Sequence, residues 1–126
     1  MLSLLLDSWI LGISLSRGFR LRYTNILDFS YLSGQDLTGS IPPEIGNLSH
    51  LESLYLCNNL FNESIPPEIG GCPKLEYLVL YNNSLSGKLP DELGHVSTLR
   101  GLNLAENQFW GRLPESLGSL ALLEEM

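Results

Sequence analysis

The chain has 126 residues, of which 44% are hydrophobic and 17% are charged, so it is long and apolar enough to fold as one ordinary domain. Its formal net charge is -7, and residues 24–126 carry four Lys and Arg against thirteen Asp and Glu. An acidic body without a basic stripe argues against nucleic acid as a partner. Two cysteines are too few for a disulfide framework and lack metal-ligand spacing, and we expect no metal and no cofactor.

The first segment, residues 1–23, begins with the apolar run "MLSLLLDSWILGISLS". Its length suits a signal peptide better than a membrane span, and we expect no membrane span in the chain. The charges do not fit a signal peptide, because Asp7 interrupts the run and the three arginines follow it at Arg17, Arg20 and Arg22. Two interpretations stay open for residues 1–23: a cleavable leader, or a degraded cap of foreign or mis-assigned sequence.

Residues 24–126 contain an internal repeat. Leucines recur every 24 residues at Leu27, Leu51, Leu75, Leu99 and Leu123, and later copies share further apolar, asparagine, proline and glycine offsets. We therefore expect about four 24-residue repeats that start at 27, 51, 75 and 99, with a partial one at 123. The copy that starts at Leu27 is looser, as terminal repeats often are, with Ser30 at an apolar position and Gln35 in place of asparagine.

Each repeat opens with a strand pattern. In "LESLYL", "LEYLVL" and "LRGLNL" the later leucines alternate with other residues, which is typical of a strand with one buried face. The pattern predicts one short strand per repeat, and stacked repeats make these strands parallel neighbours in a curved sheet. An amide follows each strand in constant register, and these side chains are predicted to form a hydrogen-bonded ladder that satisfies the turning backbone: Gln35, Asn59, Asn83 and Asn107.

The second half of each repeat predicts a short helix. A proline follows an inward apolar residue and presets the backbone for helix entry, and we expect four such residues in the core: Ile41, Ile65, Leu89 and Leu113. A glycine then follows the last inward residue, where a left-handed turn is expected, at Gly46, Gly70, Gly94 and Gly118. Cys72 takes an apolar core position, whereas Cys57 falls on an outward strand position, so we expect no bridge between them.

The pattern Leu-x-x-Leu-x-Leu-x-x-Asn-x-Leu-x-Gly-x-Ile-Pro resembles the plant-specific class of leucine-rich repeat over residues 27–126. This class occurs in the ectodomains of plant receptor-like kinases and receptor-like proteins, and in secreted polygalacturonase-inhibiting proteins. The resemblance implies an α/β solenoid with a curved parallel sheet and short helical or 3-10 segments on the convex side. Its concave and lateral surfaces would bind peptides, small ligands or a co-receptor. Glu63 departs from the family's glycine, and the missing cysteine pair and C-terminal cap imply a fragment.

Outward strand residues would form columns on the concave surface. Tyrosine is a frequent interface residue because it is rigid and amphipathic. Ordinary packing on a solvated sheet is the alternative. The residues that we expect to bind a ligand are Tyr31, Tyr55, Tyr77, Tyr81, Asn103, Glu52, Glu76 and Arg100.

Three glycosylation sequons occur, at Asn47, Asn62 and Asn82. Asn47 and Asn62 are expected on loops, whereas a glycan on Asn82 would obstruct part of the concave face.

The two histidines, His50 and His95, have no nucleophile at a meaningful spacing, and we expect no enzyme activity. The first functional hypothesis is a module for protein or peptide recognition in a plant cell-surface receptor ectodomain, outside the cell or at the outer face of the plasma membrane. The alternative is a secreted soluble inhibitor or scaffold, or a truncated remnant.

Overall fold

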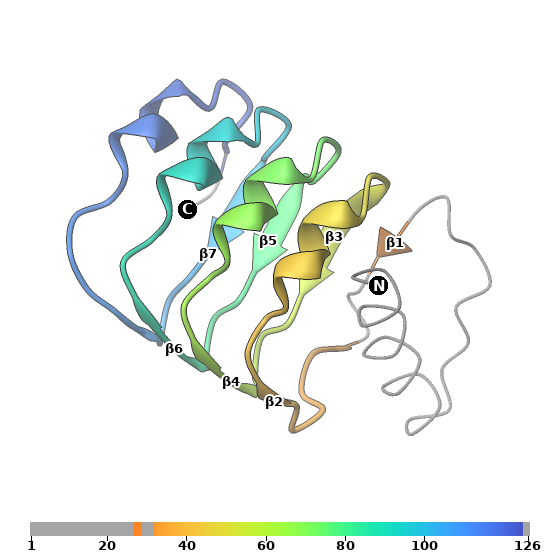
Figure 1. Ribbon diagram of the computed structural model, residues 1–126, viewed down its shortest axis with the longest axis vertical. Coiled ribbons are helices and arrows are strands. Elements are labelled where there is room, and N and C mark those ends of the chain that lie inside the picture. The colour runs from red at the N-terminus through yellow and green to blue at the C-terminus, as the bar shows by residue number, and fades with distance from the viewer. Residues whose placement is uncertain (1–26, 29–31, 125–126) are drawn as a thin grey trace.

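The computed structural model describes residues 27–28 and 32–124, which wind into a stack of coils (Figure 1). Residues 1–23, the predicted boundary at residue 24 and Tyr31 lie outside the described residues. A first sheet has the strand order β1-β3-β5-β7, with bounds Leu27–Asp28, Leu51–Tyr55, Tyr77–Val79 and Gly101–Asn103. A second sheet has the order β2-β4-β6-β8, with bounds Thr38–Gly39, Leu60–Glu63, Ser84–Gly87 and Gln108–Phe109.

The strands of the first sheet are parallel and pair in the register of the repeat. Tyr77 aligns with Ser53 on one side and with Gly101 on the other, so each partner is 24 residues away. Leu54, Leu78 and Leu102 are buried because they alternate with outward residues along these strands. The predicted α/β leucine-rich solenoid with a curved parallel sheet is confirmed. Below, the outward surface of β3, β5 and β7 is called the concave face.

The second sheet differs from the prediction of one strand per repeat. Its partners are 22 residues apart, as Glu63 with Leu85 and Gly87 with Phe109 show. These strands are only two to four residues long and lie next to turns, so their sequences resemble those of loops. One position at the end of the strand, or two residues beyond it in the last coil, has a positive φ, with values of 91° at Gly39, 64° at Glu63, 84° at Gly87 and 90° at Gly111. Glu63 thus adopts the left-handed conformation that glycine takes in the other three coils.

Short 3-10 helices cover the side of the stack opposite the first sheet (Figure 1). Each follows a proline with a φ between -58° and -71°, and each buries one apolar residue, at Ile45, Ile69, Leu93 and Leu117. The fixed proline φ is close to the helical value, so the chain enters the helix without further restriction. The helices are η2 at Pro43–Asn47, η3 at Pro67–Gly71, η4 at Asp91–His95 and η5 at Glu115–Ser119.

The helix glycines contradict the predicted left-handed turns. None of Gly46, Gly70, Gly94 and Gly118 has a positive φ. A Cβ on Gly70 would lie 2.6 Å from the backbone oxygen of Glu92 in the next helix. Gly46 faces Glu68 and Gly94 faces Ser116 in the same way, whereas Gly118 has no such contact. At the first three positions glycine lets neighbouring helices approach closely, which is a packing requirement and not a conformational one.

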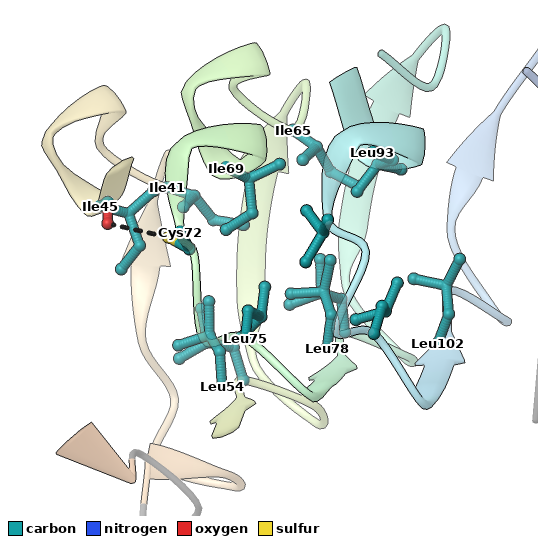
Figure 2. Packing of buried hydrophobic residues seen from close by; sticks show 14 of the residues in the cluster. Ile41, Ile45, Leu54, Ile65, Ile69, Cys72, Leu75, Leu78, Leu93 and Leu102 are labelled. Carbon is teal, nitrogen blue, oxygen red and sulfur yellow. Dashed lines mark hydrogen bonds between the residues drawn. The ribbon is translucent and has the colours of Figure 1, made fainter. Parts of the chain in front are cut away.

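One apolar core runs through the stack (Figure 2). Phe61, Leu54 and Leu78 are fully buried. Cys72 is buried beside Ile45, to whose carbonyl oxygen its Sγ donates a hydrogen bond of 3.3 Å. Ile41 and Ile65 point into this core as predicted. The prediction for Leu113 was wrong, because its side chain is 58% exposed. Leu89 is half-buried and packs against the core from its edge.

The amides that follow the strands connect each coil to the one before it. Asn59 is 6% exposed, accepts from the backbone N–H of Gln35 and Leu37, and donates to the carbonyl of Leu32 in the preceding coil. Asn83 accepts from Phe61 N–H and donates to Leu56 O. Asn107 repeats this pattern with Leu85 and Leu80. Gln35 donates to the carbonyl of Ser33 in its own coil. The three asparagines each also donate to carbonyls of their own turn, so one side chain closes two backbone turns.

Candidate binding surface on the concave face

A hollow of about 670 Å³ lies on the concave face. It is lined by residues of three adjacent strands and the segment that follows the last of them: Tyr55, Tyr77, Val79, Gly101, Leu102, Asn103 and Ala105. Two of the predicted tyrosines and Asn103 therefore share one site. The tyrosines are half-buried and Asn103 is exposed, so phenol rings and an amide border the hollow.

The hollow depends on the absence of a side chain at Gly101. An added Cβ there would lie 2.8 Å from Cδ1 of Tyr77 and 3.3 Å from its Cε1. The ring of Tyr77 thus leans over the backbone of the next strand and rests where a side chain would otherwise stand. Val79, Gly101 and Ala105 also line the hollow. They lie in outward strand columns with the predicted residues but were not among those expected to bind a ligand; the signal that could have added them is the glycine that follows tyrosine in one strand column.

The predicted charged residues form a column at the edge where the strands begin. The N–H of Glu76 donates to Glu52 O at 2.8 Å, and that of Arg100 donates to Glu76 O at 2.7 Å, so the three lie on successive coils. Each side chain is half-buried. Within the described ranges no side-chain hydrogen bond or ion pair involves Glu52, Glu76 or Arg100. The column therefore presents two carboxylates and one guanidinium beside the tyrosines.

Cys57, in the same column as Tyr81, was predicted to point outward, but the structure buries it. This cysteine is 5% exposed, and its Sγ lies 3.1 Å from the hydroxyl of Ser33 in the preceding coil. The neighbouring coils cover it, so an outward strand position became a buried one. Tyr81 is half-buried and does not line the hollow. The structure thus brings Tyr55 and Tyr77 together and leaves Tyr81 to one side.

Both cysteines are free thiols. Burial raises the pKa of Cys72 from its ordinary 9.0 to about 11, because the apolar surroundings disfavour the thiolate. A protonated, buried thiol is a poor nucleophile. Cys72 therefore acts as a small apolar core residue, as predicted from its register.

The three sequon asparagines are all exposed, at Asn47, Asn62 and Asn82. Asn47 ends helix η2 and Asn62 lies in β4, so the expectation that both lie on loops was wrong, although both side chains are exposed as a surface position requires. Asn82 has a left-handed backbone and donates from Nδ2 to Oδ1 of Asn58 at 2.9 Å. Asn82 thus differs from the other two in having its side chain bound to a neighbouring coil.

Residues 27–28 and 32–124 contain no group of three or more His, Cys, Asp or Glu side chains placed to hold a metal ion. No helix in the same ranges is both long and apolar enough to cross a membrane.

Comparisons with a protein family and with solved structures both indicate leucine-rich repeats. Residues 49–109 match the leucine rich repeat family. The receptor kinase ectodomain GASSHO1/SCHENGEN3 from Arabidopsis thaliana, solved with CASPARIAN STRIP INTEGRITY FACTOR 2, is 48% identical with a TM-score of 0.70, over 71% of this chain and 11% of that chain. The Arabidopsis receptor kinase HAESA, solved with the peptide hormone IDA and the co-receptor SERK1, is 39% identical with a TM-score of 0.70, over 71% and 15%.

The ectodomain of the Arabidopsis thaliana receptor kinase SOBIR1 is 39% identical with a TM-score of 0.71, over 75% of this chain and 50% of that chain. A search of curated proteins finds no match. The chain thus spans between 11% and 50% of the length of these three relatives. Residues 49–109 therefore consist of leucine-rich repeats. The repeats of the chain resemble part of the ectodomain of a plant receptor-like kinase.

Proposed function

We propose that this chain is a recognition module of a plant cell-surface receptor ectodomain and that it binds a peptide on its concave face. The observation that carries the proposal is the open hollow bordered by Tyr55, Tyr77 and Asn103. Amphipathic rings with a few polar groups are typical of peptide-binding surfaces. The similar HAESA structure, which was solved with a peptide hormone and a co-receptor, supports the choice of a peptide.

In this proposal the chain acts outside the cell, at the outer face of the plasma membrane, and a co-receptor is a further partner. It has no catalytic role of its own. The likeness to receptor ectodomains built of leucine-rich repeats supports this assignment. Asn47 and Asn62 are the proposed glycan acceptors. Asn82 is the less favourable one because of its contact with Asn58.

The test is selection from a displayed library of random peptides on the full chain produced by a secretory host. Peptides retained by the unaltered chain should lose binding to the double variant Tyr55→Ala, Tyr77→Ala by about tenfold or more, because aromatic anchors carry much of the energy of such interfaces. Trp110→Ala is the matched control, since Trp110 is a 60% exposed aromatic residue outside the hollow. Equal binding to the double variant would refute the proposal.

A further inference from the structure

The charged column beside the hollow is not explained by the stability of the fold. Glu52 and Glu76 carry like charges on neighbouring coils, which is unfavourable for a parallel pair of strands. Arg100 follows Glu76 in the column, yet no ion pair joins them in the part of the chain that the structure describes. Side chains that neither pack fully nor pair with each other are free to interact with a ligand.

The hollow adds an apolar requirement at the same end of the face. The backbone of Gly101 forms its floor, and the Tyr77 ring leans over that floor from the adjacent strand. A flat or branched apolar side chain that enters here would contact the ring and the backbone at once. The carboxylates lie on the two earlier coils and the guanidinium on the coil of Gly101, so charge and apolar contacts have a fixed order along the stack.

Geometry sets the spacing of a complementary ligand. Neighbouring strands are about 4.8 Å apart, so Glu52 and Arg100, two strands apart, are separated by roughly 10 Å. An extended peptide advances about 3.3 Å per residue. A ligand that lies across the strands would therefore present its two charged residues about three positions apart.

Resting on the proposed function, we infer that the concave face selects an extended peptide of defined charge order that crosses the strands. A basic side chain faces Glu52 and Glu76, an acidic side chain about three residues away faces Arg100, and an apolar side chain between them enters the hollow over Gly101 against Tyr77. Either chain direction satisfies these contacts, because the order refers to the stack and not to the peptide termini.

The experiment extends the library selection with a charge-swapped chain, Glu76→Arg with Arg100→Glu, which keeps the net charge. Peptides retained by the unaltered chain are expected to carry a basic and an acidic residue about three positions apart with an apolar residue between them. They should bind the swapped chain about tenfold more weakly or worse, since like charges then face each other. Raising NaCl from about 0.05 M to about 0.5 M should weaken binding to the unaltered chain, because exposed charges are screened.

Lys88→Glu is the matched control, because it changes the charge of an exposed residue that is not in the charged column. Circular dichroism and the thermal midpoint of the swapped chain establish that it folds. Two results would overturn the inference while leaving the proposed function intact: retained peptides without the charge pair, or unchanged binding to the swapped chain. If no peptide distinguishes the unaltered chain from the Tyr55→Ala, Tyr77→Ala variant, the proposed function itself fails and this inference falls with it.

Discussion

The coil that starts at Leu51 and the coil that starts at Leu99 have the same repeat chemistry but different burial. Ile65 is 2% exposed in the first, whereas Leu113 at the equivalent position is 58% exposed in the second. Phe61 is fully buried, but its counterpart Phe109 is only half-buried. The first coil packs against described neighbours on both sides and the second against one. A leucine of the motif thus becomes a core residue only through the coil that covers it.

The largest expected difference between the two coils lies in their apolar residues. Ile65→Ala should lower the free energy of unfolding by about 2–5 kcal/mol, because it leaves a cavity in a packed core. Leu113→Ala should cost less than about 0.5 kcal/mol, as surface substitutions usually do. Urea unfolding followed by circular dichroism measures both. Equal losses would mean that the two positions are buried alike in solution.

The ladder asparagines offer a second comparison. Asn59→Ala should cost about 2–3 kcal/mol, because the N–H groups of Gln35 and Leu37 and the carbonyl of Leu32 lose their partner. Asn107→Ala should cost about half as much, since Asn107 is less buried and its own turn is partly exposed to water. Chemical unfolding and amide hydrogen exchange at Leu37 and Leu85 report the two effects. If the amides of Leu37 and Leu85 still exchange slowly in the corresponding alanine variants, the assigned hydrogen bonds are contradicted.

The buried thiol of Cys72 should make the stability of the fold depend on pH. Its pKa is raised to about 11 in the folded chain, so folding favours the thiol over the thiolate. The stability from this group is fully present below the ordinary value of 9.0 and is lost as pH rises towards 11, by up to about 2 kcal/mol. We expect the wild-type chain to lose more unfolding free energy than Cys72→Ala between these pH values. Parallel slopes for the two proteins would show that the thiol is not shielded.

Effects of about 2 kcal/mol or less are expected at the left-handed position of the second sheet. Gly87→Ala should cost about 1–2 kcal/mol, because a side chain is disfavoured at a φ of 84°. Gly39→Ala measures the cost of the left-handed backbone alone, because an added Cβ at Gly39 meets no atom within 4 Å and so adds no steric contact. Glu63→Gly should stabilise the chain by up to about 1 kcal/mol, as strain relief outweighs the added freedom of the unfolded chain. Thermal unfolding measures all three, and a destabilised Glu63→Gly variant would show that Glu63 makes a compensating contact.

The sequence predicted the first sheet, the proline-led helices and most inward residues, with Leu113 as the exception, because these depend on local periodicity. It did not predict the second sheet, in which a single buried residue such as Phe61 or Leu85 lies among exposed ones. Two to four residues of alternation are too few to distinguish a strand from a turn. The role predicted for Gly46 and Gly70, a left-handed turn, was wrong for another reason. Glycine is required there because the next helix packs closely against it, and the local sequence does not contain that helix.

The candidate binding surface was predicted in part. Tyr55, Tyr77 and Asn103 were expected on one face, and the hollow brings them together. The tilt of the Tyr77 ring over Gly101 was not foreseeable, because it depends on the side chain that the neighbouring strand lacks. The burial of Cys57 likewise results from contacts with residues of adjacent coils, such as Ser33. Register places a residue in a column, but only the neighbouring columns decide its exposure.

The asparagine ladder also bears on how the chain is made. Asn83 and Asn107 each form hydrogen bonds to backbone groups of the coil before them. The backbone hydrogen bonds of such a turn are therefore completed only by a side-chain amide that lies about one repeat further along the chain. On the ribosome, synthesis at about 5–20 residues per second would deliver that amide roughly 1–5 s later. Nascent coils would then close one behind the other, each with an open turn at its growing end until the next segment emerges.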